Sequence, residues 1–170
     1  MLKKIILTSA VCLFSNYALA SPPAAYIGGS IGINVNTNGS NGSFRGLPLT
    51  ISAGYGGMIN PSLYLAGEVY GVLVTASLND NGNLKSTYGY GISFIPGLAL
   101  SDHAMAFLRA GAVKSRFTRM SSTKTGGEVG VGLQASLTQY MDLRSEYDFI
   151  KYKGSLYADQ FNFGLVYKFL

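Results

Sequence analysis

The sequence is poor in the side chains that metal sites and nucleotide sites require. Its one cysteine, Cys12, falls in an N-terminal segment that we expect to be removed, so the mature chain has no thiol for a disulfide or a metal. It has one histidine, His103, and its carboxylates are spread over different predicted strands. The glycine-rich run at residues 28–32 lies within a predicted strand that no helix follows, unlike a phosphate-binding loop. We therefore expect no metal and no cofactor.

Charge is scarce as well. Charged residues make up 12% of the chain and hydrophobic residues 48%, whereas about 25% charged residues is usual in soluble domains. Beyond the N-terminal segment, no apolar run approaches the ~20 residues with which a helix crosses a bilayer. Such a chain must place its apolar side chains by alternation along strands. Its 22 glycines, 12 tyrosines and 9 phenylalanines fit a fold rich in strands and turns.

The N-terminus has the layout of a secretory signal peptide. Two lysines precede an apolar stretch at residues 5–14, and Ala18 and Ala20 put small residues at the two positions that a signal peptidase reads. We predict a signal peptide at residues 1–20, cleaved after Ala20, and a single mature domain at residues 21–170.

Alternation of apolar and polar residues is clearest in the last ten residues. Apolar side chains share one parity there, and polar side chains or glycine mostly take the other, which is the period-two pattern of a strand with one apolar face. The same pattern recurs in seven earlier segments. The eight predicted strands are residues 25–35, 47–59, 63–75, 88–100, 105–117, 127–137, 141–152 and 161–170.

The connections between these strands alternate in length. Short turns are expected at residues 60–62, 101–103 and 138–140, and longer polar segments at 36–46, 76–87, 118–126 and 153–158. Short turns at one rim and long loops at the other are typical of outer-membrane barrels. We therefore predict an all-β fold, an eight-stranded antiparallel transmembrane up-and-down β-barrel with both termini on the short-turn, periplasmic side.

Two residues affect the details of this prediction. Arg109 would be stranded in hydrocarbon if it faced outward, so we expect Ala106, Leu108 and the alanines that continue their parity to face lipid. Pro96 cannot donate a ladder hydrogen bond, so we expect a bulge or an early loss of pairing near that end of the fourth strand.

A soluble sandwich or a lipocalin-like barrel would show the same alternation with its apolar face turned inward. Here the polar faces hold mainly Gly, Ser, Thr, Asn and Tyr, which is too little charge for eight faces in water. Small residues such as Gly54, Gly91 and Gly130 would leave room for long neighbours in a narrow lumen. A closed barrel also has no edge strand whose backbone hydrogen-bonding groups would be left unsatisfied in lipid. These features favour an apolar face turned toward lipid.

Six charged residues fall on the predicted inner faces. They are Glu68, Arg109, Glu128, Arg144, Glu146 and Asp148. Charges of both signs can neutralise each other inside a narrow barrel, where a lone charge would be costly. We predict an internal charge network that fixes strand register and plugs the lumen; the alternative is a gated polar path or small pore.

The end of the last strand resembles a known recognition signal. A polar residue, a glycine and two aromatic residues are spaced there as in the C-terminal signal of bacterial outer-membrane β-barrels; they are Asn162, Gly164, Tyr167 and Phe169. The resemblance implies that the barrel-assembly machinery reads this strand.

Three internal runs extend the resemblance to the whole mature chain. Residues 64–70, 107–113 and 143–148 are similar to strands of the small OmpA, OmpX and opacity-protein barrels. The resemblance implies an integral outer-membrane protein with a non-enzymatic role, either in envelope integrity or in surface interaction and adhesion through its extracellular loops.

Basic residues gather at the predicted long-loop rim, where Asp80 and Asp159 are the only acidic neighbours expected. The basic residues are Arg45, Lys85, Lys114, Arg116, Arg119, Lys124, Lys151 and Lys153. Such a rim suits lipopolysaccharide phosphates, although isolated surface charges can also be merely solvated. We expect outer-membrane lipid, lipopolysaccharide and a host or environmental surface ligand as partners, no nucleic acid, and a monomer.

Catalysis has little support in the sequence. Ser101, Asp102 and His103 contain the residue types of a hydrolytic triad, but neighbours on one turn cannot present nucleophile, base and orienting acid to one another. The turn also falls on the periplasmic rim, away from the outer leaflet. We therefore expect that the protein is not an enzyme. The alternatives are a small porin or channel and, with less support, a lipid A-modifying outer-membrane enzyme.

Overall fold

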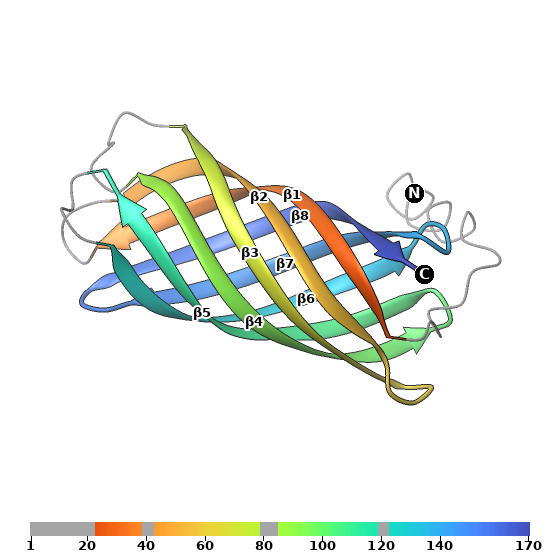
Figure 1. Ribbon diagram of the computed structural model, residues 1–170. Coiled ribbons are helices and arrows are strands. Elements are labelled where there is room, and N and C mark those ends of the chain that lie inside the picture. Colours follow the sequence, from red (N-terminus) through yellow and green to blue (C-terminus); the bar gives the residue numbers. More distant parts are fainter. Residues whose placement is uncertain (1–22, 39–42, 79–84, 119–122) are drawn as a thin grey trace, which may run out of the picture.

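The computed structural model describes residues 23–38, 43–78, 85–118 and 123–170, whose strands form one closed antiparallel barrel (Figure 1). Each strand pairs with its sequence neighbours, and β1 pairs with β8 to close the sheet. The strands are β1 (Ala24–Asn38), β2 (Ser43–Met58), β3 (Leu63–Ser77), β4 (Ser86–Ser101), β5 (Ala104–Phe117), β6 (Lys124–Ser136), β7 (Met141–Tyr152) and β8 (Leu156–Phe169). The predicted eight-stranded up-and-down barrel is confirmed. The predicted signal peptide, residues 1–20, lies outside the described residues.

Within the described ranges, no helix has the length and hydropathy needed to cross a membrane.

Most strands are longer than predicted, and the four long connections are correspondingly shorter. β1 and β2 continue into the segment 36–46, where Thr37 pairs with Ser43, and β8 begins at Leu156 instead of residue 161. Ladder hydrogen bonds use backbone groups, so pairing continues after the apolar alternation has ended. The connection between β7 and β8 is therefore a tight turn, in which Gly154 adopts a φ of 96° that suits glycine.

Near Pro96 pairing with β5 is interrupted, in line with the prediction, although β4 itself continues to Ser101. The missing N–H interrupts only the ladder with β5, which skips from Phe94 to Gly97 without a change of register. A register shift does occur closer to this end of the strand, between Ala99 and Ser101.

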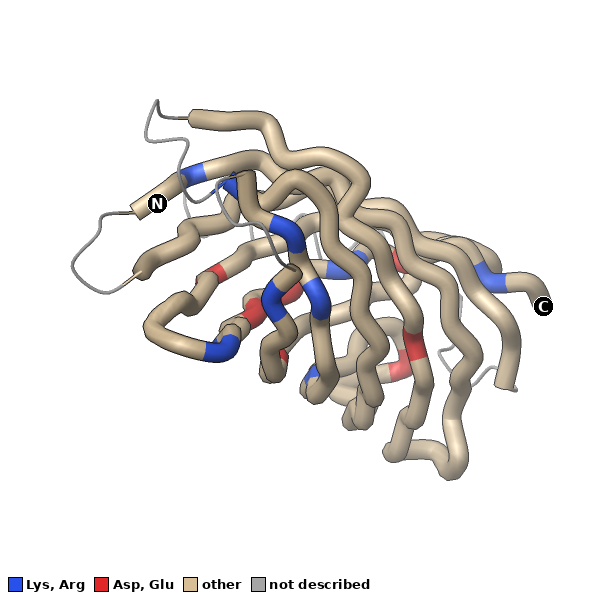
Figure 2. The backbone as a smooth tube through the Cα atoms, turned by 60° about the vertical axis from the view of Figure 1, so that its left-hand side comes forward, with Lys and Arg blue, Asp and Glu red and all other residues tan. Residues whose placement is uncertain are grey.

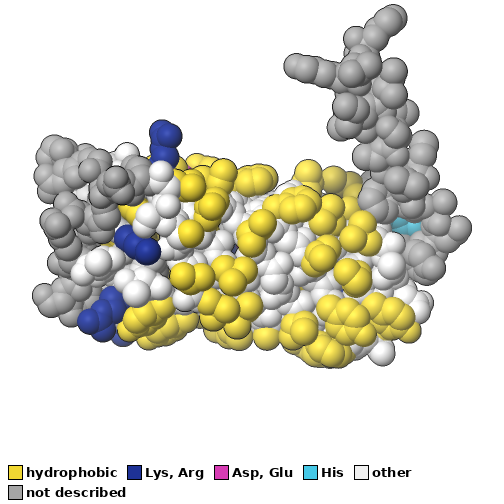
Figure 3. All heavy atoms as spheres, turned by 90° about the horizontal axis from the view of Figure 1, so that it is seen from above, with side chains coloured by type: hydrophobic (Ala, Val, Ile, Leu, Met, Phe, Trp, Pro, Cys, Tyr) yellow, Lys and Arg dark blue, Asp and Glu magenta, His cyan; other side chains and the backbone are white. Residues whose placement is uncertain are grey.

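Side chains alternate between the outer surface and the lumen along the strands. On β5, Leu108 is 56% exposed and Arg109 is 4% exposed, which confirms the predicted orientation of this strand. Hydrophobic side chains cover much of the outer surface in Figure 3, and Lys and Arg side chains gather at one end. An outer face of this kind is suited to the hydrocarbon of a bilayer.

Inward-facing glycines make room for large side chains on the neighbouring strand. Three cross-strand pairs show this: Tyr26 with Gly54, Tyr70 with Gly91, and Phe107 with Gly132. A Cβ atom at these glycines would come within 2.3, 2.5 and 2.2 Å of the paired ring. The narrow lumen therefore holds these rings only because the opposite position has no side chain.

The lumen contains a charged layer between two apolar layers. One apolar layer lies near the terminus end, where β1 begins and β8 ends; it includes Tyr26, Tyr64, Ile95, Met105 and Phe107. The other lies near the opposite end, the loop end, and includes Phe44, Val113, Phe117, Tyr152 and Leu156. Figure 2 shows that many of the Lys and Arg positions lie toward one end of the barrel, while others lie beside acidic positions.

Paired residues followed once around the barrel give the offset between the strands. The path starts at Gly54 on β2 and returns to β2 at Phe44, ten residues away; it passes through Glu68, Ser93, Gly111, Glu128, Ile150, Ala158 and Asn36. An offset of this size in an eight-stranded barrel corresponds to strands tilted by about 40°.

Candidate functional site in the lumen and at the loop end

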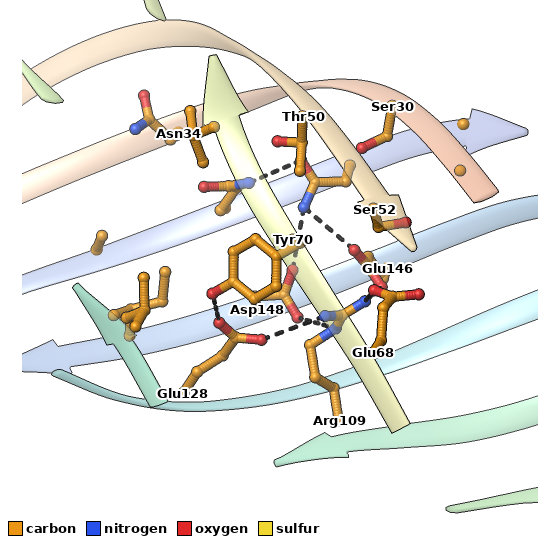
Figure 4. Close-up of a pocket in the computed structure, with 18 of the residues that line it drawn as sticks. Ser30, Asn34, Thr50, Ser52, Glu68, Tyr70, Arg109, Glu128, Glu146 and Asp148 are labelled. Atoms are coloured by element: carbon orange, nitrogen blue, oxygen red, sulfur yellow. Dashed lines mark hydrogen bonds and ion pairs between the residues drawn. The ribbon is translucent and has the colours of Figure 1, made fainter. Parts of the chain in front are cut away.

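The structure brings the six charged residues of the predicted interior network together in the charged layer. They come from β3, β5, β6 and β7, and five of the six are labelled in Figure 4, where their side chains converge in the lumen. Glu146 is the least buried, with 10% of its side chain exposed.

Arg109 lies at the centre of this network. Its Nη2 contacts Glu68 Oε1 at 2.7 Å and Glu146 Oε2 at 3.0 Å. Its Nη1 lies 3.6 Å from Glu128 Oε1, and its Nε lies 3.8 Å from Asp148 Oδ1. One guanidinium therefore faces carboxylates from β3, β6 and β7 and connects these strands across the lumen.

Arg144 forms the second centre, and Glu68 links it to the first. Its Nη1 contacts Glu68 Oε2 at 2.6 Å, and its Nε donates to Gln134 Oε1 at 2.9 Å. Its guanidinium carbon lies 5.5 Å from the ring centroid of Tyr26 and 5.3 Å from that of Phe107. Cation–π contacts of this kind stabilise a desolvated guanidinium.

Uncharged polar side chains complete the network, and the sequence did not single them out for this role. Tyr70 Oη donates to Glu128, and Ser93 Oγ donates to the other oxygen of Glu128 at 3.2 Å. Asn162 Nδ2 donates to Asp148 Oδ2 at 3.0 Å. Asn162, which we assigned only to the C-terminal signal, thus also belongs to the lumen.

A cavity of about 50 Å³ lies beside the network, with both polar and apolar side chains in its lining. Five buried polar atoms of its lining have no hydrogen-bond partner among the described residues: Asn34 Oδ1, Thr50 Oγ1, Arg109 Nε, Arg144 Nη2 and Asp148 Oδ1. A cavity of this size with several polar atoms in its lining suits one or two water molecules, each of which makes about three hydrogen bonds. The lumen can therefore hold ordered water between its apolar layers.

A second buried ion pair lies near the terminus end, and the sequence analysis missed it. Asp142 is fully buried, and its Oδ1 contacts Lys168 Nζ at 2.9 Å. Ser136 Oγ donates to Oδ1 at 3.0 Å, and Gln134 Nε2 donates to Oδ2 at 2.6 Å. The inward parity of Lys168 in the last strand was the available signal, but its partner could not be read from β8 alone.

Replacing Lys168 with glutamine is expected to lower the free energy of unfolding by about 2 kcal/mol, because it leaves the buried Asp142 carboxylate without its cation. The loss is smaller than for a central residue, since two neutral donors remain on Asp142. Urea unfolding in lipid vesicles measures it. A double variant that also carries Asp142→Asn should recover part of the loss; no recovery would contradict this account.

The turn between β4 and β5 carries the three residues considered for a hydrolytic triad. His103 donates its backbone N–H to Ser101 Oγ at 3.3 Å, which is a local turn contact. The turn lies at the terminus end. Among the described residues, no group of three or more His, Cys, Asp or Glu side chains could hold a metal ion.

The four residues of the C-terminal signal take different positions in the barrel. Asn162 faces the lumen, and Gly164 lies where β8 meets β1, opposite Ser30. Tyr167 and Phe169 face outward with ring centroids 5.2 Å apart, and Tyr140 stacks on Tyr167 at 6.3 Å. These three rings form an aromatic patch on the outer surface at the terminus end, as barrels have at membrane interfaces.

Six of the predicted rim residues form what we call the basic arc, on the consecutive strands β4 to β7 or directly beside them at the loop end. They are Lys85, Lys114, Arg116, Lys124, Lys151 and Lys153. None of the six pairs with a carboxylate of the described residues. Arg45 lies apart on β2, while Arg119 and Asp80 lie outside the described residues. The nearby Asp159, on β8, accepts a hydrogen bond from Tyr147 Oη at 2.5 Å.

Comparison with known proteins gives consistent results. A family model described as the outer membrane protein beta-barrel domain matches residues 5–169. The chain is similar to the crystal structure of Neisserial surface protein A, with a TM-score of 0.65 and 20% identity over 88% of this chain and 100% of that one. It is also similar to Ail, the attachment invasion locus protein of Yersinia pestis, with a TM-score of 0.60 and 14% identity over 91% and 100%.

A further structure of Ail, in complex with the heparin analogue sucrose octasulfate, matches with a TM-score of 0.58 and 16% identity over 88% of this chain and 100% of that one. At these identities the likeness concerns the fold. No curated protein sequence matches the chain.

Proposed function

The chain belongs to the outer membrane protein β-barrel family, and from that premise we propose that it is a non-enzymatic surface protein whose basic arc binds anionic ligands at the extracellular face. The loop end then faces the cell exterior and the terminus end faces the periplasm, which is the usual orientation of outer-membrane barrels. Envelope integrity and surface contact are the roles that follow from such binding.

The observation that carries this proposal is the set of six cations without carboxylate partners among the described residues. Unpaired Lys and Arg side chains beside an anionic surface contribute about 1 kcal/mol each. Phosphates of lipopolysaccharide in the outer leaflet and sulfated or phosphorylated glycans of a host surface share the required chemistry. That Ail was crystallised with sucrose octasulfate supports a ligand of this class by analogy of fold.

Neutralising the β6–β7 part of the basic arc is expected to weaken binding of a soluble polyanion about a hundredfold at physiological salt, since each of the three cations contributes about 1 kcal/mol. The variant replaces Lys124, Lys151 and Lys153 with glutamine, and sucrose octasulfate is the probe. Titration calorimetry of the detergent-folded mature protein at two salt concentrations measures the effect.

An Asp159→Asn variant serves as the control of opposite sign, and should bind the probe at least as tightly as the parent. Because the arc acts by charge, affinity should also fall as salt rises. Equal affinity of the triple variant and the parent, at both salt concentrations, would refute the proposed role of the arc.

The interior network supports a plugged lumen instead of a porin. Two apolar layers and a salt-bridged layer fill the interior, and an eight-stranded barrel leaves little room for a continuous water path. An enzymatic role has little support. The residues considered for catalysis lie in the turn between Ser101 and Ala104, which contains His103, on the face that we assign to the periplasm. The network then acts as a structural element that fixes the register of β3, β5, β6 and β7.

A further inference from the structure

A shallow groove crosses the outer surface from β2 to β5. Its outward-facing lining consists of Ala53, Gly67, Val69, Ile92, Phe94 and Ala112. Small residues form its floor: at Gly67, no atom lies within 4 Å of the position that a Cβ would occupy. Its walls are large side chains, and Ile92 and Phe94 are more than half exposed. We call this feature the β2–β5 groove.

Two basic residues lie at the end of the β2–β5 groove that is nearer the loop end of the barrel. Ala112 lies on the groove floor, and Lys114 and Arg116 follow it on the same outward face of β5 toward the loop end. Lys114 pairs with Tyr90 and Arg116 with Tyr88 on β4, so two exposed tyrosines flank the cations. Cations next to tyrosines are typical of the boundary between headgroups and hydrocarbon.

The extent of the β2–β5 groove along the membrane normal fits within one leaflet. From Tyr90, beside Lys114, to Phe94 in the groove wall is four residues along β4. At about 3.4 Å per residue and a tilt of about 40°, this descends about 10 Å, within the ~15 Å of hydrocarbon in one leaflet. A chain that enters below the two cations would therefore remain in the outer leaflet.

The chemistry of the site points to a lipid with phosphate at its head and an acyl chain below it. In hydrocarbon the groove gives no hydrophobic gain, so affinity must come from close packing and from the charges. A second barrel placed here would have to cover Lys114 and Arg116 with its own apolar face, at the desolvation cost of two charges. Phosphorylated glycolipid provides both the anion and the chain.

We propose that the β2–β5 groove seats one acyl chain of a lipopolysaccharide molecule whose phosphate is held by Lys114 and Arg116. This rests on the proposed extracellular placement of the basic arc, and it narrows the ligand there from anions in general to a lipid in a defined position. The groove would bind the acyl chain of the lipid, and the two cations would bind its phosphate.

Filling the groove should separate this proposal from simple charge attraction. The parent, Gly67→Leu, a Lys114→Gln/Arg116→Gln double variant and Gly29→Leu are placed in phosphatidylcholine nanodiscs that contain lipopolysaccharide, and the lipopolysaccharide retained per barrel is counted by native mass spectrometry. Gly29 also faces outward with no atom within 4 Å of an added Cβ, but lies on β1 away from the groove. A heat-modifiable gel shift confirms that each variant is folded.

We expect Gly67→Leu to retain several-fold less lipopolysaccharide than the parent, Gly29→Leu to retain as much as the parent, and the double variant to lose about fivefold per cation removed. Equal retention by Gly67→Leu and the parent would overturn the groove proposal, while sucrose octasulfate binding to the basic arc could still stand. Retention of phosphatidylcholine as strong as that of lipopolysaccharide would overturn the proposed lipid class. No retention of lipopolysaccharide by the parent, together with no binding of sucrose octasulfate, would overturn both proposals.

Discussion

Replacing Arg109 with methionine is expected to lower the free energy of unfolding of the barrel by about 3–5 kcal/mol. The guanidinium lies 2.7 to 3.8 Å from four carboxylates. Its loss leaves these carboxylates facing Arg144 alone in a lumen that offers little solvation, and buried charges without partners are strongly destabilising. Urea unfolding in lipid vesicles, followed by the heat-modifiable gel shift, measures the change.

Lys153→Met is the matched control, since it makes the same kind of replacement at an exposed residue of the basic arc and should change stability by no more than about 0.5 kcal/mol. Adding Glu146→Gln to Arg109→Met should restore part of the loss, because it removes one of the stranded charges. Single-channel recording tests the proposed plug in the same proteins. Large, stable conductances in both the parent and Arg109→Met would contradict the plug.

Valine at position 164 is expected to weaken closure of the barrel, at a cost of about 3 kcal/mol. A Cβ at Gly164 would lie 2.3 Å from the backbone oxygen of Gly29, and 2.6 and 2.8 Å from Cβ and Cα of Ser30. Relief requires movement of β1 backbone, and β1 and β8 are held together by a continuous ladder from Ala25–Phe169 to Asn38–Leu156. The measurement is the fraction of protein that reaches the heat-modifiable form after refolding in detergent.

Gly29→Val tests the same strand seam without the collision, because no atom lies within 4 Å of its added Cβ. It should refold like the parent. Refolding in detergent takes place without assembly machinery, so the experiment also separates packing from recognition of the C-terminal signal. If Gly164→Val refolds as well as Gly29→Val but fails to assemble in cells, the steric account is wrong and the glycine acts through recognition.

The barrel itself could be predicted from the sequence because alternation reports directly which face of a strand is buried. Arg109 shows why this reasoning extended to the lumen. A charge on one parity of an otherwise apolar segment has a single acceptable direction in a membrane, and this determined the orientation of β5. The other five interior charges followed by the same argument, although their individual partners did not.

Contacts between side chains inside the lumen could not be predicted from the sequence, because they depend on the offset between strands. Lys168 had the correct inward parity, but nothing in β8 indicates that Asp142, on β7, lies beside it. Tyr70 could not be assigned to Glu128 for the same reason, since these residues are 58 positions apart on non-adjacent strands. Strand ends were misjudged where polar residues continue the backbone ladder, as they do at Thr37 and Ser43.

The offset of ten residues around the barrel has a consequence for how its calibre can change. Because Gly54 and Phe44 both face inward, the offset must be even; an odd value would join an inward row to an outward one. Strand number and offset together set the diameter. The barrel diameter can therefore change only in steps. Substitutions along the strands can alter which side chains line the barrel, but only a register shift of two residues or an added β-hairpin can make it wider.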